Sequence, residues 1–176
     1  METHKCEKGC CTIKIKPYLK SKNRYLRPHR KSGVFLYDPM RDKVLLIQSR
    51  GHLWGLPKGS VKCGETERLC SVREVFEETG LIISEDNFTR ATTIMNQSTY
   101  FYLEHNVCDV TIKDCIEDND ANGITWIHPD CLETLIINGN ITLTHHCRIV
   151  FQRFIQRTFP HCTFILVERK KRRKRF

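Results

Sequence analysis

The chain has 176 residues, 40% of them hydrophobic, and a formal net charge of +9. This length allows one domain with a full hydrophobic core and leaves little room for a second large one. No apolar run approaches the roughly 20 residues that a membrane helix needs, and the start METHKCEKG lacks the apolar centre of a secretory signal. We therefore expect an intracellular protein, most simply a cytoplasmic one, with no membrane partner.

The positive charge is concentrated at the two ends of the chain. Residues 1–31 contain ten Lys or Arg and two acidic residues, and residues 169–176 contain seven Lys or Arg and no acid. The intervening part has a net charge of −6. Basic ends suit a polyanionic partner, whereas an acidic centre suits a metal site. We predict a basic N-terminal segment over 1–31, one folded domain over 32–168 and a basic arm over 169–176.

Ten cysteines are scattered through a chain that is large enough to form a core without disulfides, so we expect most of them to be reduced. Four potential zinc ligands lie close together near the N-terminus: His4, Cys6, Cys10 and Cys11. His145, His146 and Cys147 form a second cluster. Neither cluster has the usual Cys-x-x-Cys spacing, and we therefore favour free thiols over structural zinc. Metal analysis of protein purified without added zinc distinguishes the two.

Two basic segments are candidates for contact with RNA. The sequence KIKPYLKSKNRYLRPHRK (residues 14–31) places Tyr18 and Tyr25 among basic residues, which suits phosphate contact combined with base stacking. The alternative is that the tyrosines anchor this segment to the domain. The run ERKKRRKRF (168–176) is too uniformly charged to fold alone. We favour an RNA-binding tail there over a nuclear-import signal and over a solubility feature.

Short runs rich in apolar, β-branched and aromatic residues predict strands at five places: residues 34–37, 44–48, 89–95, 99–103 and 123–127. The first two flank the turn-forming sequence DPMRD. The acidic stretch KDCIEDNDANG (113–123) predicts an exposed loop between two of the later strands.

Residues 66–79 predict a helix that carries a cluster of carboxylates. Thr66 can cap its start, and Gly80 supplies the left-handed residue that commonly ends a helix. At about 100° per residue, an apolar stripe and an acidic face lie on opposite sides: Leu69, Val72, Val75 and Phe76 on one, Glu67, Glu74, Glu77 and Glu78 on the other. We interpret Glu67 as solvated surface. The other three carboxylates lie within one turn of each other and would repel without a hard cation such as Mg²⁺ or Mn²⁺.

Residues 144–158 return to helical periodicity and predict a last helix. Its apolar stripe and its basic outer face consist of different residues: Cys147, Phe151, Phe154 and Ile155 in the stripe, and His146, Arg153 and Arg157 on the outer face. Pro160 should end the helix, and residues 163–167 predict a final strand. The chain has no repeats and no Pro/Gly/Ser-rich linker. We therefore predict one α/β domain with helices on both sides of a mixed sheet.

The sequence GSVKCGETERLCSVREVFEETGL (residues 59–81) is similar to the Nudix box, Gly-x5-Glu-x7-Arg-Glu-apolar-x-Glu-Glu-x-Gly-apolar, at every fixed position. The resemblance implies the Nudix fold, an α/β/α sandwich with a mixed β-sheet. It also implies metal-dependent hydrolysis of a phosphoanhydride. A non-catalytic RNA-binding module on the same scaffold is a weaker alternative, because degenerate members could lose glutamates and this chain has the complete set.

The same resemblance implies a role for each residue of the site. Metal ligands are expected to be the Gly59 carbonyl and the side chains of Glu74, Glu77 and Glu78. One of the two paired glutamates, by resemblance Glu78, is expected to act as general base. The resemblance also implies that Glu65 and Arg73 pair with each other and orient the loop against the helix, and Lys58 is a candidate phosphate contact.

Sequences outside the box narrow the substrate. WGLPKG (54–59), REVFEETG (73–80) and ITWIHPDCL (124–132) resemble the catalytic subunit of the mRNA-decapping complex, over about residues 33–130. That family implies capped RNA as partner and substrate, with 7-methyl-GDP and 5′-monophosphate RNA as products. Family members also use a further glutamate, before the closing Trp, as a metal ligand or base. The position here nearest to it is Asp120, and Glu117 is the other candidate. Cellular decapping enzymes have a helical regulatory domain before the Nudix domain, where this chain has about thirty residues rich in basic side chains. Short members without that domain resemble those encoded by large DNA viruses, and the sequence indicates no specific regulatory protein partner.

The basic helix that follows the closing strand in decapping enzymes corresponds here to the helix bearing Arg153 and Arg157. We expect these residues, with the arm from Arg169 to Arg175, to bind RNA. A methylated guanine favours aromatic stacking, for which the loose candidates are Trp54, Tyr100, Tyr102 and Trp126. We expect each of them to belong to the core instead. The main alternative substrates are diadenosine polyphosphates, whose hydrolases share WGLPKG, and diphosphoinositol polyphosphates.

Overall fold

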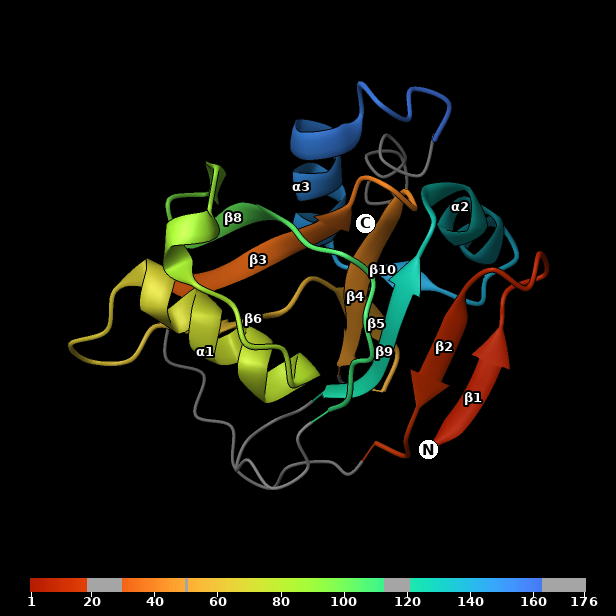
Figure 1. Cartoon of the computed structure of the whole chain (residues 1–176), viewed down its shortest axis with the longest axis horizontal. Coiled ribbons are helices and arrows are strands. Elements are labelled where there is room, and N and C mark those ends of the chain that lie inside the picture. Colours follow the sequence, from red (N-terminus) through yellow and green to blue (C-terminus); the bar gives the residue numbers. More distant parts are fainter. Residues whose placement is uncertain (19–29, 50, 113–120, 163–176) are drawn as a thin grey trace, which may run out of the picture.

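A computed structural model describes residues 1–18, 30–49, 51–112 and 121–162 (Figure 1). The strands are β1 (Glu2–Lys5), β2 (Thr12–Ile15), β3 (Lys31–Asp38), β4 (Lys43–Ser49), β5 (Leu53–Gly55), β6 (Lys58–Ser60), β7 (Arg90–Ile94), β8 (Ser98–Glu104), β9 (Ala121–Ile127) and β10 (Thr142–Leu143). The helices are α1 (Glu67–Thr79), α2 (Pro129–Ile137) and α3 (His145–Ile155), with a 3-10 turn, η1, at Glu85–Asn87. No described helix is long and apolar enough to cross a membrane.

The strands form one mixed sheet in the order β1-β2-β9-β4-β3-β8-β7. β3 and β8 run parallel, whereas β4 and β9 run antiparallel. β3 and β4 pair only beside their connecting turn, at Tyr37↔Val44 and Asp38↔Lys43. Farther along, β3 pairs with β6 and β4 pairs with β5. Strands β5 and β6 therefore pair with the parts of β4 and β3 that no longer pair with each other.

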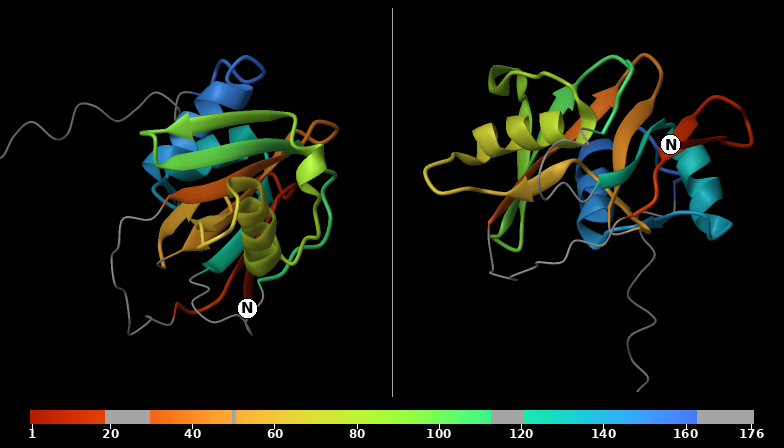
Figure 2. Two further views of the ribbon diagram at one scale, coloured as in Figure 1. Left: turned by 90° about the vertical axis from the view of Figure 1, so that its left-hand side faces the viewer. Right: turned by 90° about the horizontal axis from the view of Figure 1, so that it is seen from below.

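Both faces of the central strands are buried, because successive side chains of a strand point to opposite faces. Val34 and Leu36 of β3 pack with Val75 of α1 in one core cluster. Phe35 packs on the other face, against Phe151 of α3. Figure 2 shows α1 on one side of the sheet and α2 with α3 on the other. The α/β/α sandwich predicted from the sequence is confirmed.

The predicted secondary structure is confirmed at all five strands and at two helices. Thr66 caps α1 by accepting a hydrogen bond from the Leu69 N–H at 3.1 Å, and Gly80 ends it with φ 76°. α3 begins after its cap Thr144 but ends at Ile155, three residues earlier than predicted. Helix α2, the turn η1 and the strands β1, β2, β5, β6 and β10 were not predicted. The predicted strand at 163–167 and most of the predicted loop at 113–123 lie outside the described residues.

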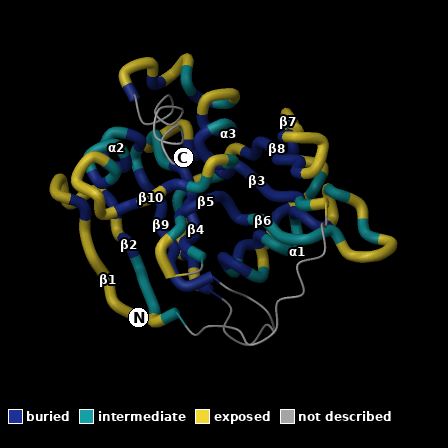
Figure 3. The backbone as a smooth tube through the Cα atoms, turned by 180° about the vertical axis from the view of Figure 1, so that it is seen from behind, coloured by how far each residue is buried: buried dark blue, intermediate teal, exposed yellow. Residues whose placement is uncertain are grey.

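The N-terminal segment begins as part of the sheet. β1 and β2 form a hairpin, and β2 pairs with β9 from Thr12↔Trp126 to Ile15↔Gly123. β1 is exposed along its whole length, as an edge strand (Figure 3). The predicted N-terminal segment 1–31 therefore contributes β1 and β2 to the same sheet as the predicted domain 32–168.

Candidate active site

The close packing of β3 against the chain before α1 shapes the site. A Cβ atom at Gly33 would lie 2.4 Å from the Pro57 carbonyl oxygen and 2.6 Å from the Lys58 Cβ. Glycine at this position allows the Val34 N–H to donate to the Pro57 carbonyl at 3.0 Å. The start of the Nudix box is thereby fixed to the centre of the sheet.

Helix α1 lies close to the same strand because small side chains face it. The hydroxyls of Ser71 and Ser32 are 2.7 Å apart, and both side chains are buried. The apolar stripe predicted for this helix was wrong at two positions, since Leu69 is 48% exposed and Phe76 is 40% exposed. The buried face instead consists of Cys70, Ser71, Val75, Glu78 and Thr79. Because this face of the helix is buried, one carboxylate of the box points toward the protein interior.

Glu78 is that inward-facing carboxylate, and it is only 7% exposed. Its Oε2 accepts a hydrogen bond from the Lys58 backbone N–H at 2.9 Å. This bond ties the end of α1 to β6 and fixes the orientation of the carboxyl group. A carboxylate held in this way is suited to the role of a positioned base.

Glu74 packs directly against Gly59. A Cβ atom at Gly59 would lie 1.9 Å from the Glu74 Oε1, a distance no side chain can accept. The glycine that opens the box is therefore needed to leave room for this carboxylate. Burial raises the pKa of Glu74, and repulsion from Glu77 adds to the rise, while Arg73 opposes it. A bound cation would favour the ionised form of this buried carboxylate.

Arg73 connects three glutamates. Its Nε and Nη2 donate to the two carboxylate oxygens of Glu65 at 2.8 and 2.9 Å, and its Nη1 contacts Glu74 at 2.6 Å and Glu77 at 3.1 Å. Nη2 also donates to the Ser60 carbonyl at 3.1 Å. The pair between Glu65 and Arg73 that the resemblance implied is thus present. It links the loop before α1 to the acidic face of the helix.

The three glutamates predicted to bind metal do not converge on one point. Among the described residues, the sets of His, Cys, Asp or Glu ligand atoms within 4.8 Å of one another do not include Glu74, Glu77 and Glu78. Arg73 Nη1 contacts the first two instead and offsets part of their negative charge. Carboxylates and the Gly59 carbonyl nevertheless form the all-oxygen donor set that Mg²⁺ and Mn²⁺ prefer. A divalent ion would fit these residues by replacing the contacts of Nη1.

The ion pair between Glu65 and Arg73 leads to a prediction about stability and pH. Hydrogen bonds from Arg73 lower the pKa of Glu65 to about 2, against a burial effect that raises it. Because the folded-state pKa lies below the ordinary value, the stabilisation is present above about pH 5 and is lost as the pH falls toward 2. Glu65→Gln should lower the free energy of unfolding by about 2–3 kcal/mol at pH 7 and by less at pH 3. Urea denaturation at both pH values measures this.

Glu67→Gln is the matched control for Glu65→Gln. Glu67 pairs with Arg30 at the surface, where an ion pair contributes little. Its substitution should change stability much less at either pH. An equal loss in the two variants at pH 7 would show that the pair with Arg73 has no special role.

The other predicted site residues are placed as follows. Arg153 is exposed on α3, and its guanidinium donates to the Thr93 carbonyl at 3.0 Å and contacts Thr92. Arg157 is exposed in the turn after the helix. Asp120, Glu117 and the arm from Arg169 to Arg175 lie outside the described residues.

His146 does not lie on the outer basic face of α3 as predicted. It is half-buried, and its Nδ1 lies 3.2 Å from the Tyr100 hydroxyl. Burial lowers its pKa, and positive charge from His145, Lys58 and Lys31 adds to the effect. The helical wheel could not show this, because the contact with Tyr100 depends on how α3 packs against the sheet.

The four aromatic candidates for stacking on the cap belong to the core. Trp54 and Tyr100 are each 1% exposed, and Tyr102 and Trp126 are also buried. None of the four therefore presents a free ring face, and the expectation that they are core residues is confirmed.

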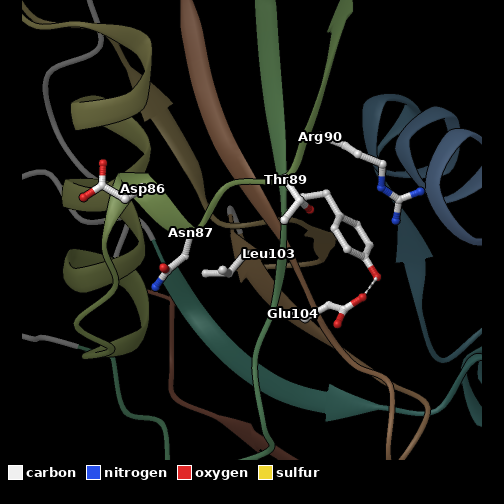
Figure 4. A pocket seen from close by; sticks show the side chains of 7 residues that line it. Asp86, Asn87, Thr89, Arg90, Leu103 and Glu104 are labelled. Atoms are coloured by element: carbon white, nitrogen blue, oxygen red, sulfur yellow. Dashed lines mark hydrogen bonds between the residues drawn. The ribbon is translucent and has the colours of Figure 1, made fainter.

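A surface hollow of about 630 Å³ lies beside η1 and the ends of β7 and β8 (Figure 4). It is lined by Asp86, Asn87, Thr89, Arg90, Tyr102, Leu103 and Glu104. The Arg90 guanidinium lies 3.8 Å from the centre of the Tyr102 ring, whose hydroxyl donates to Glu104 at 3.1 Å. No glutamate of the Nudix box lines this hollow, so it is not where a diphosphate would be hydrolysed.

Comparison with known proteins agrees with the geometry. Residues 27–146 match the family model described as NUDIX domain. The 111R protein of Invertebrate iridescent virus 3 is 29% identical over 156 residues, which cover 84% of this chain and 91% of that protein. The m7GpppN-mRNA hydrolase dcap-2 of Caenorhabditis elegans is 40% identical over 81 residues, 43% of this chain. The match covers only 10% of the length of dcap-2.

A solved structure shows the same fold. The MutT/nudix family protein from Enterococcus faecalis is 23% identical, with a TM-score of 0.54, over 84% of this chain and 70% of that one. The family model covers well over half of the chain, and its box forms the capped helix and the Arg73-centred carboxylate cluster described above. This protein belongs to the Nudix family of phosphoanhydride hydrolases.

Proposed function

We propose that the protein is an mRNA-decapping enzyme, which hydrolyses the triphosphate bridge of capped RNA to 7-methyl-GDP and 5′-monophosphate RNA. The 40% identity to the decapping hydrolase dcap-2 carries the choice of substrate. The charge distribution supports it, because a long RNA offers many phosphates to the basic ends of the chain.

The residues of the site divide the reaction between them. Glu78, oriented by the Lys58 N–H, accepts the proton of the attacking water as the new phosphorus–oxygen bond forms. The Gly59 carbonyl, Glu74 and Glu77 would hold Mg²⁺ or Mn²⁺, with Glu78 also among the ligands. When bound, these ions neutralise the phosphate oxygens and lower the pKa of a bound water. Lys58 and the basic residues outside the box position the substrate.

The choice of substrate is tested by incubating the protein with four compounds, each with Mg²⁺ or Mn²⁺. The compounds are cap-labelled RNA, free cap dinucleotide, a diadenosine polyphosphate and an inositol pyrophosphate. Release of 7-methyl-GDP from long RNA alone is the expected result. The WGLPKG sequence shared with diadenosine polyphosphate hydrolases makes a small-molecule hydrolase the second candidate. Faster turnover of either small substrate than of capped RNA would favour it.

Deletion of residues 169–176 should weaken binding of capped RNA and flatten its dependence on salt. These residues carry seven positive charges, and removing the charge that neutralises one phosphate reduces the slope of log K against log salt by about 0.9 for a duplex and 0.7 for a single strand. Binding isotherms at several salt concentrations measure the slope. Replacing the seven basic residues by Gln, at unchanged length, is the matched variant. An unchanged slope in both would make the arm a targeting or solubility element.

A further inference from the structure

Four cysteine thiols from two distant parts of the chain meet beside α2. Cys6, Cys10 and Cys11 lie in the turn of the β1–β2 hairpin, and Cys131 lies in the first turn of α2. The Sγ of Cys10 is 3.6 Å from that of Cys6 and 3.5 Å from those of Cys11 and Cys131. All four sulfur atoms lie within 4.8 Å of one another. Figures 1 and 2 show the hairpin beside this helix.

These separations match the requirements of one tetrahedral metal ion. With zinc–sulfur bonds of about 2.3 Å, the sulfur atoms of a tetrahedral site lie about 3.8 Å apart. The four thiols are therefore already close to the corners of such a site. A zinc ion would require only small shifts of the sulfur atoms.

Backbone N–H groups support negative charge on the sulfurs. The Cys11 N–H donates to the Cys6 Sγ at 3.3 Å, and the His128 N–H donates to the Cys11 Sγ at 3.3 Å. Outer hydrogen bonds of this kind orient metal ligands.

The surroundings of the four thiols suit a structural ion and not a catalytic one. Cys6, Cys11 and Cys131 are buried, and Cys10 alone is exposed. Four protein ligands would leave no open position for a substrate or water, which is typical of structural zinc. Lys43 donates to the Cys10 carbonyl, and its positive charge would offset part of the excess negative charge of four thiolates.

We propose that these four cysteines bind one structural Zn²⁺, which attaches the N-terminal hairpin to α2. His4, a ligand candidate from the sequence, is not one of them, because it is largely exposed and lies beside Glu2. The fourth ligand is Cys131. The ion would hold the hairpin of β1 and β2 at the edge of the sheet, where β2 pairs with β9 and β1 is exposed. This role is independent of the reaction at the Nudix glutamates.

Metal analysis of the full-length protein tests the proposal. The protein is purified without added zinc and exchanged into buffer with excess Mg²⁺, which occupies oxygen-ligand sites. We expect about one zinc per chain in the wild type and in the control Cys63→Ser, whose cysteine is exposed and outside the cluster. Cys6→Ser and Cys131→Ser should retain almost none. Their thermal midpoints should fall by about 5 °C or more.

A second measurement covers the case in which the cysteine variants do not fold. Wild-type protein reconstituted with Co²⁺ should show the intense visible bands and the thiolate-to-metal charge-transfer absorption of tetrahedral four-sulfur coordination. Weak absorption typical of oxygen ligands, zinc near zero in protein whose thiols are all reduced, or a disulfide within the cluster by mass spectrometry would each overturn the proposal.

Discussion

Glu78→Gln is expected to lower the rate of hydrolysis by about 10³-fold or more, with little loss of RNA binding. The amide oxygen of Gln can still accept the hydrogen bond that the Lys58 N–H donates to Glu78, so the helix end should stay in place. The amide cannot take a proton from water, and it is a weaker metal ligand than a carboxylate. Single-turnover rates measure the loss of hydrolysis, and separate binding isotherms show whether RNA binding is retained.

Glu67→Gln is the matched control for the rate of hydrolysis. It makes the same chemical change on the same helix, but Glu67 pairs with Arg30 and does not contact the glutamate cluster around Arg73. Its turnover should equal that of the wild type. If Glu78→Gln also turned over at the wild-type rate, Glu78 would not be the base.

Gly59→Ala is expected to lower kcat by about 10²-fold or more, the typical effect of misplacing a catalytic group by about 1 Å. The added methyl group would lie 1.9 Å from the Glu74 Oε1, so either the carboxylate or the β6 backbone must move. Moving β6 would also displace the Gly59 carbonyl and the Lys58 N–H that holds Glu78. The change therefore disturbs the predicted ligand Glu74 if only the side chain moves, and Gly59 and Glu78 as well if the backbone moves.

Gly139→Ala separates this effect from a general loss of stability. Gly139 has a φ of 77°, and an added Cβ would meet nothing within 4 Å. Its substitution should cost about 1 kcal/mol of folding stability through backbone strain. We expect the kcat of this variant to be unchanged. Normal kcat in Gly59→Ala, at a folded fraction equal to that of Gly139→Ala, would contradict the packing argument.

Local signals in the sequence were sufficient to predict the catalytic helix. Thr66 and Gly80 mark its two ends by capping chemistry that involves only near neighbours in the chain. The spacing of the glutamates likewise follows from the helical period. Which face of the helix is buried did not follow, because hydrophobicity placed Leu69 and Phe76 inside. The close approach of Ser71 to Ser32 decides the orientation, and it is visible only in the folded chain.

Long-range pairing explains the other differences. Residues 1–18 show no periodicity from which the pairing of β2 with β9, more than one hundred residues away in the chain, could be predicted. The same pairing brings Cys131 to the cysteines of the hairpin turn. Helix α2 did leave a local signal in the sequence, since Pro129 stands in its first turn after the capping residue His128. The shortness of this helix, nine residues, gave its apolar period little length in which to appear.

The central claim is that the glutamates of α1 and the Gly59 carbonyl hold the divalent ions that drive hydrolysis. A crystal structure of the protein soaked in Mn²⁺, with anomalous scattering to locate the metal, tests it most directly. We predict at least one ion coordinated by the Gly59 carbonyl and by two or more of Glu74, Glu77 and Glu78, with the Nη1 of Arg73 withdrawn from Glu74. Glutamates still joined to Arg73, with no manganese among them at a concentration that supports turnover, would contradict the account.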